Sequence, residues 1–247
     1  MKILVTGAKG FVGENLIAEL KNIGYNEIYE CDTSTTELEL DEYIKNCEFV
    51  FHFAGKKRVE DEAFFMESNY GFTATILEKL KQYNNKAPIL FTSSILAELD
   101  TTYAKSKKQA EDILFEYENQ ANTNVIIYRL SNLYGKWSQC KYNGVVSEFC
   151  KNISRDIPVE ISDKDTEIKL MYIQDVVREF TNVLQGNGNK QGKYYEVPVY
   201  DNIKLGELVE VIKGFKSENK AVFDSKFNKD FIQKLYSTYL AYSPKEK

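Results

Sequence analysis

The start of the chain constrains the fold most, because an apolar segment at residues 3–5 runs directly into Gly7, Gly10 and Gly13. The apolar segment predicts a buried parallel strand, and the residues after Gly13 have the periodicity of an amphipathic helix. Glycines at this spacing allow a tight turn, a close approach of the backbone to a pyrophosphate, and close helix–strand packing. Free N–H groups at the helix start would face the phosphates. We therefore expect a dinucleotide-binding turn that opens an α/β fold.

Strand-like and helix-like segments alternate through the first half of the chain. Runs rich in β-branched and aromatic residues recur at residues 27–31, 49–52, 89–92 and 125–129. Segments with helical periodicity lie between or after them, at residues 12–21, 38–45, 64–82 and 103–119. This alternation predicts an α/β protein with a Rossmann-type, doubly wound parallel sheet.

The pattern loosens after Gly135. We expect short strands at 159–161, 167–171 and 193–197, helices at 173–184 and 205–215, and a surface loop at 185–192. Residues 1–135, rejoined by 168–200, are predicted to form the dinucleotide-binding domain. Residues 136–167 and 201–247 are predicted to form a small C-terminal substrate-binding lobe.

Composition argues against several classes of function. With 247 residues, 43% of them hydrophobic, the chain can bury a large core, and its net charge of −5 disfavours broad binding to nucleic acids or anionic membranes. No segment approaches the length of a membrane span, and the first residues do not resemble a secretion signal, so we expect a cytoplasmic protein. The four cysteines form no CxxC pair and His52 is the single histidine, so we expect reduced thiols, no metal site and no Ser/His/Asp triad.

Three side chains form a candidate proton-transfer group. Tyr103 and Lys107 are four residues apart, which places a phenol and an ammonium on one face of a helix. A lysine cation, together with an oxidised nicotinamide ring, is expected to bring the pKa of Tyr103 towards neutrality. Ser94 follows an apolar strand, at the edge where ligands of open α/β sheets bind. Each feature alone also fits a solvated helix face or a strand end, but their order along the chain favours a shared site.

These segments resemble the extended short-chain dehydrogenase/reductase family. The motifs that carry the resemblance are TGAKGFVG at 6–13, HFAG at 52–55, Asn69, SSI at 93–95, YAKSK at 103–107 and RLSNLYG at 129–135. The resemblance implies that Ser94, Tyr103 and Lys107 are catalytic and that His52 is structural. The implied cofactor contacts are Gly7, Lys9, Gly10, Phe11, Val12, Gly13, Asp32, Thr33, Phe53, Ala54, Gly55, Arg58, Tyr103 and Lys107. The implied substrate contacts are Ser94, Ile95, Asn132, Lys136, Trp137, Tyr142 and Asn143.

A narrower resemblance, to the reductase half of CapF-type capsule enzymes, rests on residues 135–137, 142–143, 149–150 and 235–240. It implies NAD(P)H-dependent reduction at C4 of a 4-keto-6-deoxy UDP-N-acetylhexosamine for surface polysaccharide synthesis. The metal-binding cupin domain of those enzymes, which epimerises C3, is not expected in this chain. Whether the chain is a natural short form or one domain of a longer protein stays open. Because family members often dimerise, we also expect a homodimer.

Several alternatives remain open. Asp32 follows the second strand and favours NAD(H), since it would accept hydrogen bonds from a ribose 2′-hydroxyl, whereas Lys9 and the basic residues 56–58 would favour NADP(H). A nucleotide-sugar 4-epimerase or 4,6-dehydratase of the same family is the second hypothesis, although Ile95 and Leu96 stand where dehydratases carry an acidic pair. A third is a non-catalytic NAD(P)-sensing or scaffold protein. The sugar and the configuration of its product at C4 are not determined.

Overall fold

The computed structural model describes residues 1–56, 62–138, 144–217 and 227–243. The chain forms two compact units, Met1–Leu130 with Val177–Val197, and Ser131–Val176 with Pro198–Lys247. These bounds differ from the predicted domains, because residues 131–135, 168–176 and 198–200 belong to the second unit rather than the first. The physical reason is strand pairing, since residues 132–134 pair with 170–172 in a separate sheet.

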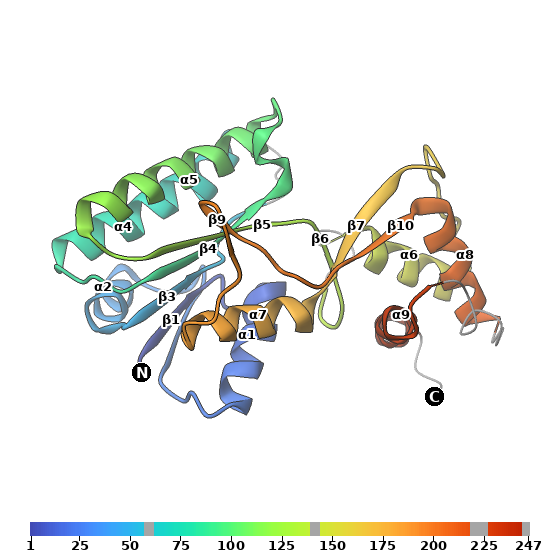
Figure 1. The fold of residues 1–247 in the computed structure, drawn as a ribbon, viewed down its shortest axis with the longest axis horizontal. Coiled ribbons are helices and arrows are strands. Elements are labelled where there is room, and N and C mark those ends of the chain that lie inside the picture. Colours follow the sequence, from blue (N-terminus) through green and yellow to red (C-terminus); the bar gives the residue numbers. More distant parts are fainter. Residues whose placement is uncertain (57–61, 139–143, 218–226, 244–247) are drawn as a thin grey trace. The chain divides into compact units, whose positions relative to one another are not determined.

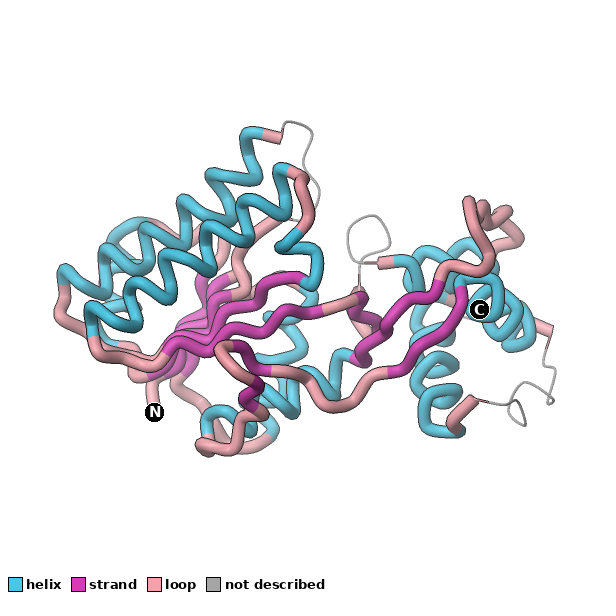
Figure 2. Tube along the Cα trace, turned by 45° about the horizontal axis from the view of Figure 1, so that its top comes forward, coloured by secondary structure: helices cyan, strands magenta, loops and turns pink. Residues whose placement is uncertain are grey.

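The first unit is built on a seven-stranded sheet in the described part of the chain. Its strand order is β2-β1-β3-β4-β5-β9-β8, with β8 antiparallel to β9 and every other pairing parallel. Figure 2 shows the strands as magenta segments. The strands are β1 (Ile3–Thr6), β2 (Ile28–Cys31), β3 (Phe49–His52), β4 (Ile89–Ser94), β5 (Val125–Leu130), β8 (Lys190–Gln191) and β9 (Tyr194–Tyr195). The order reverses at β1, which confirms the predicted doubly wound fold and places the carboxyl ends of β1 to β5 at one edge.

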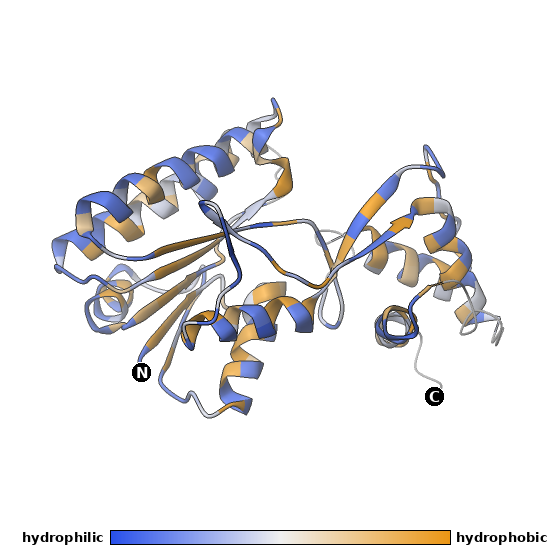
Figure 3. Cartoon of the chain, viewed as in Figure 1, coloured by the Kyte–Doolittle hydropathy of each residue, from blue (hydrophilic) through white to orange (hydrophobic). Residues whose placement is uncertain are grey.

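Helices cover both faces of this sheet (Figure 1). The helices are α1 (Phe11–Asn22), α2 (Glu37–Asn46), α4 (Phe72–Gln82), α5 (Thr102–Ala121) and α7 (Ile173–Leu184). Buried side chains of α2, α4 and α5 pack on those of β1, β3, β4 and β5 to form one continuous core. Figure 3 shows the reason: the strands are largely hydrophobic, whereas α4 and α5 alternate between hydrophobic and hydrophilic residues.

The predicted helix at 64–82 is interrupted. It consists of α3 (Ala63–Phe65), a π-helical turn η1 (Met66–Gly71) and α4. A π-helical turn carries one extra residue per turn and is often found at functional sites. Here it contains the fully buried Asn69.

The second unit contains a three-stranded sheet in order β10-β7-β6, formed within the described residues by β6 (Asn132–Tyr134), β7 (Glu167–Tyr172) and β10 (Asp201–Lys204). Side chains from α6 (Val145–Ser154), α8 (Leu205–Lys216) and α9 (Lys229–Tyr242) complete its core. We did not predict α6, α9, β6, β8 or β10. The predicted strand at 159–161 is wrong, because Val159 and Ile161 pack on this core while their backbone pairs with no strand in the described chain. The predicted strand at 193–197 shortens to β9.

Among helices in the described ranges, none has the length and apolar character needed to cross a membrane.

The core on the α2, α4 and α5 face gives a stability prediction. Leu114 of α5 is fully buried in it, whereas Leu38 of α2 is 83% exposed. We expect Leu114→Ala to lower the free energy of unfolding by about 2–5 kcal/mol, because it removes packed methyl groups and leaves a cavity. The control Leu38→Ala should change it by less than about 0.5 kcal/mol. Urea denaturation followed by circular dichroism measures both, and equal effects would contradict this packing.

Candidate active site

The turn after β1 is shaped for close backbone approach. Gly7 has φ +69°, and a Cβ there would lie 2.8 Å from the backbone nitrogen of Ala54. A Cβ on Gly13 would collide with the carbonyl oxygen of Gly7. Gly10 caps α1 without a side-chain hydrogen bond, so no side chain of its own covers the helix start. This side-chain-free cradle at a helix N-terminus fits a dinucleotide pyrophosphate.

Asp32, at the end of β2, is paired with a cation of the glycine turn. Its Oδ2 lies 2.5 Å from Nζ of Lys9, and its Oδ1 accepts hydrogen bonds from the backbone N–H and hydroxyl of Ser34 at 2.7 and 2.6 Å. These contacts, led by Lys9, hold the pKa of Asp32 well below its ordinary value, and the pKa of Lys9 is raised in turn. Asp32, which favours NAD(H), and Lys9, which favours NADP(H), therefore form one ion pair.

Ser94 and Tyr103 lie at the carboxyl edge of the sheet. Ser94 ends β4, and Tyr103 lies in the first turn of α5, close enough for the Ser94 hydroxyl to influence the pKa of the phenol. Burial raises the pKa of Tyr103, and the Ser94 hydroxyl opposes that shift. We expected Lys107 to lower this pKa, but burial of the phenol decides the direction of the shift. The phenol of Tyr103 therefore keeps its proton at neutral pH.

Lys107 lies in the same region but is buried, with 7% of its surface exposed. Its Nζ donates to the carbonyl oxygen of Thr92 at 3.1 Å and sits 4.8 Å from the centre of the Phe91 ring. Burial lowers the pKa of Lys107 to about 8, and the charge of Glu111 opposes this shift. A Cβ on Gly55 would lie 3.3 Å from this Nζ, so the loop after β3 directly adjoins the catalytic candidate.

A chain of hydrogen bonds runs from Ala54, beside the glycine turn, through His52 to Asn69. The N–H of Ala54 donates to the Thr6 hydroxyl at 3.2 Å, and that hydroxyl lies 2.7 Å from Nδ1 of His52. On the other side of the ring, Nε2 lies 2.9 Å from the Thr73 hydroxyl, which donates to the carbonyl oxygen of Asn69 at 2.6 Å. Because the Thr73 proton is used on Asn69, His52 must donate through Nε2 and accept at Nδ1. His52 thus connects β1, β3 and the π-helical turn, in line with its expected structural role.

The side chain of Asn69 continues this connection to the helix that carries Tyr103. Its Oδ1 accepts from the backbone N–H of Lys56 at 2.8 Å, and its Nδ2 donates to the Lys56 carbonyl oxygen at 3.1 Å and to the Ser106 hydroxyl at 2.9 Å. Ser106 donates to the carbonyl oxygen of Tyr103 at 2.7 Å. The sequence motif contained Asn69 but did not reveal this role, which depends on the π-helical turn.

The structure distributes the predicted substrate residues over both units. Ile95, 48% exposed, follows Ser94 in the first unit. In the second unit Asn132 donates to the carbonyl oxygen of Lys169 at 3.3 Å, and Nζ of Lys136 lies 4.4 Å from the Trp137 ring centre. The other two predicted substrate contacts, Tyr142 and Asn143, lie outside the described residues, as does Arg58, a predicted cofactor contact. Within the described ranges, no cluster of three His, Cys, Asp or Glu side chains is arranged to hold a metal ion.

Sequence reasoning missed one buried charged pair. Arg129, next to the end of β5, donates from Nε and Nη2 to the two carboxylate oxygens of Glu111 at 2.8 and 2.6 Å. No local spacing marks this pair, because Arg129 lies on a strand and Glu111 on a helix 18 residues away in the sequence.

The chain is similar to known proteins in sequence. Residues 3–197 match the NAD dependent epimerase/dehydratase family, to which the chain belongs. It is 39% identical over 246 residues to the UDP-2-acetamido-2,6-beta-L-arabino-hexul-4-ose reductase of Pseudomonas aeruginosa, with 100% of this chain and 66% of that protein covered.

The chain is also similar to solved structures in its fold. The crystal structure of the capsular polysaccharide assembling protein CapF from Staphylococcus aureus has a TM-score of 0.85 and 35% identity, covering 99% of this chain and 65% of that one. The predicted resemblance to the CapF type is therefore confirmed. UDP-glucose 4-epimerase from Thermus thermophilus, solved with NAD, shares the fold with a TM-score of 0.79 at 18% identity, covering 98% and 99% of the two chains. The chain thus spans just under two thirds of the Pseudomonas and Staphylococcus proteins.

The hydrogen-bond chain predicts the tautomer and charge of His52. Burial, helped by the charge of Lys107, lowers the pKa of His52 to about 3. We expect the ring to stay neutral from about pH 5 to 8, a range in which a free histidine titrates, and to carry its proton on Nε2. Because the sequence has one histidine, NMR of protein labelled with ¹⁵N-histidine reports this ring alone. A proton on Nδ1, or titration near the ordinary histidine pKa, would contradict the assigned directions.

The Lys9–Asp32 pair predicts an effect on cofactor preference. We expect Lys9→Gln to weaken NADPH binding relative to NADH by about tenfold, the size of a lost charge-assisted contact, because Asp32 would then repel a 2′-phosphate. Cofactor titrations followed by fluorescence measure the ratio of the two dissociation constants.

Lys21→Gln is the matched control for this charge change. Lys21 pairs with Glu30 of β2 at 2.8 Å. Its replacement should leave the ratio of the two dissociation constants unchanged. An unchanged ratio in Lys9→Gln, or an equal change in both variants, would remove Lys9 from cofactor selection.

Proposed function

We propose that the protein reduces the C4 carbonyl of a UDP-linked 2-acetamido-2,6-dideoxy-4-keto-hexose, using NADPH or NADH, in surface polysaccharide synthesis. One observation carries the proposal most directly: Ser94 and Tyr103 lie close together beside the buried Lys107, at the sheet edge that also carries the glycine cradle. Similarity along the whole chain to the Pseudomonas reductase supports this substrate class.

In this mechanism the glycine turn and the start of α1 bind the cofactor pyrophosphate, with Ala54 and Gly55 beside it. A bound reduced nicotinamide supplies the hydride for the carbonyl carbon. Ser94 orients the carbonyl oxygen through its hydroxyl, and Tyr103 donates its proton to the alkoxide that develops there. Burial of Tyr103 suits this acid role, since the raised pKa keeps the proton available. Lys107 would contact the nicotinamide ribose of the bound cofactor.

The second unit is proposed as the substrate lobe. Its candidate residues for contact with the UDP-sugar are Asn132, Lys136 and Trp137. The exposed indole of Trp137 offers a flat apolar surface for a uracil or sugar ring. We also propose that the protein acts in the cytoplasm as a homodimer and does not bind nucleic acid.

A 4-epimerase of the same family is the main alternative. An epimerase recycles its cofactor, whereas a reductase consumes it in proportion to product. Purified protein should oxidise NADPH or NADH only when a 4-keto-6-deoxy UDP-N-acetylhexosamine is added. Interconversion of UDP-hexosamines without consumption of added cofactor would overturn the proposal in favour of an epimerase.

The assignment of Tyr103 as proton donor gives a direct test. We expect Tyr103→Phe to reduce turnover by at least about 10²-fold, because it removes the acid, while the cofactor dissociation constant stays within about twofold. Stopped-flow absorbance of the reduced cofactor and equilibrium titration measure these quantities.

Tyr25→Phe is the matched control, since Tyr25 precedes the amino end of β2, at the opposite edge of the sheet. It should behave as wild type. Substantial turnover by Tyr103→Phe would exclude Tyr103 from the acid role.

A further inference from the structure

The turn that follows Ser94 is weakly held by packing. It is a 3₁₀ helix, η2 (Ile95–Glu98), in which Ala97 is buried while Ile95 and Leu96 are 48% and 37% exposed. Its first hydrogen bond uses the hydroxyl of Ser94 itself, which accepts from the Leu96 N–H at 3.2 Å. A shift of the turn would therefore move the Ser94 hydroxyl.

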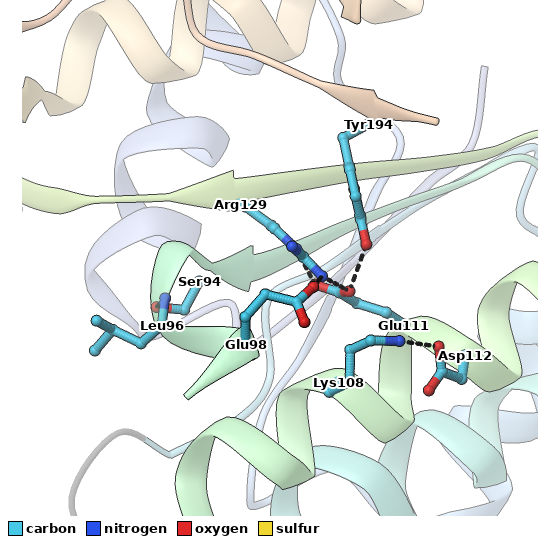
Figure 4. A network of polar contacts seen from close by, with 8 residues as sticks. All are labelled: Ser94, Leu96, Glu98, Lys108, Glu111, Asp112, Arg129 and Tyr194. Carbon is cyan, nitrogen blue, oxygen red and sulfur yellow. Dashed lines mark hydrogen bonds and ion pairs between the residues drawn. The ribbon is translucent and has the colours of Figure 1, made fainter. Parts of the chain in front are cut away.

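An ion pair links the end of this turn to the neighbouring strand (Figure 4). Glu98 places Oε1 2.6 Å from Nη2 of Arg129, and Arg129 stands opposite Ser93 in the register of β4 and β5. Glu98 is 63% exposed at its side chain, whereas that of Arg129 is 18% exposed. Glu98 is thus the exposed partner of the pair, and Arg129 is the more buried one.

Arg129 is anchored by the helix that carries Tyr103 and Lys107. Its guanidinium donates through two nitrogens to Glu111, which is fully buried and which also accepts from the Tyr194 hydroxyl at 2.9 Å. The guanidinium carbon lies 4.2 Å from the centre of the Tyr194 ring. A buried carboxylate is tolerated only with such partners, so the Arg129–Glu111 pair has little freedom to move.

The two partners of Arg129 each lie close in sequence to a predicted catalytic residue. Glu98 lies four residues after Ser94, and Glu111 lies four residues after Lys107. On α5 this spacing places Glu111 one turn from Lys107 on the same face. One guanidinium therefore bridges the turn that holds Ser94 and the helix that holds the other two groups.

We propose that Arg129 is a positioning residue, which holds the Ser94 turn in register with the Tyr103 helix through Glu98 on one side and Glu111 on the other. This inference rests on the proposed function, because Ser94 and Tyr103 act on one carbonyl oxygen there. Loss of the tether would leave cofactor binding intact and would reduce the fraction of molecules in which both hydroxyls are aligned.

Glu98→Ala tests the tether without exposing the buried pair. We expect kcat with the 4-keto UDP-sugar to fall about threefold to fivefold, the range expected for loss of an exposed ion pair, with KM for NADPH unchanged. Amide hydrogen exchange of residues 95–99 should become faster. Glu98→Gln, whose amide oxygen still accepts from Arg129, should recover part of both effects.

Asp100→Ala is the control, because Asp100 carries the same charge close by but pairs with Lys105, at 2.6 Å, instead of Arg129. It should leave kcat and the exchange of residues 95–99 unchanged. Wild-type kcat and exchange in Glu98→Ala, or equal losses in Asp100→Ala, would overturn the proposal. If wild-type protein does not reduce the sugar, the proposed function fails, and exchange in Glu98→Ala still decides whether the tether exists.

Discussion

The candidate site depends on the close approach of two backbone segments, the glycine turn at Gly7 and the loop at Ala54. Gly7 leaves no room for a side chain beside Ala54, and Thr6 joins both segments to His52 through hydrogen bonds. From there the polar chain runs through Thr73 to Asn69, and from the Asn69 side chain to the helix of Tyr103. The glycine turn and the helix that carries Tyr103 are thus parts of one hydrogen-bonded frame, in which the bonds of His52 are buried from competing water.

Charge is distributed in this frame so that each buried ion has a partner. Lys107 is stabilised by a carbonyl oxygen, an aromatic face and the charge of Glu111, and Glu111 is hydrogen-bonded by Arg129. Asp32 is stabilised by Lys9 at the surface. These partners offset the cost of burying charged groups in the candidate site.

Sequence reasoning was reliable where periodicity and special residues act locally. The strand at 49–52 and the glycine turn agree with the structure, because a buried parallel strand reads as a continuous apolar run. Prediction from the sequence failed where contacts between distant residues decide the local structure. Residues 159–161 alternate like a strand but lack a partner, and the helix at 64–82 contains a π-helical turn that no local signal marks. The raised pKa of Tyr103 depends on burial, which the spacing of Tyr103 and Lys107 cannot show.

The central claim is that this chain delivers hydride to C4 of a 4-keto UDP-sugar while its own tyrosine supplies the proton. The most direct measurement uses NADPH or NADH deuterated at the transferable position of the nicotinamide, with NMR of the sugar product. The account predicts one deuterium at C4 for each cofactor oxidised. A product without deuterium at C4, or conversion of the sugar without net oxidation of the cofactor, would contradict it.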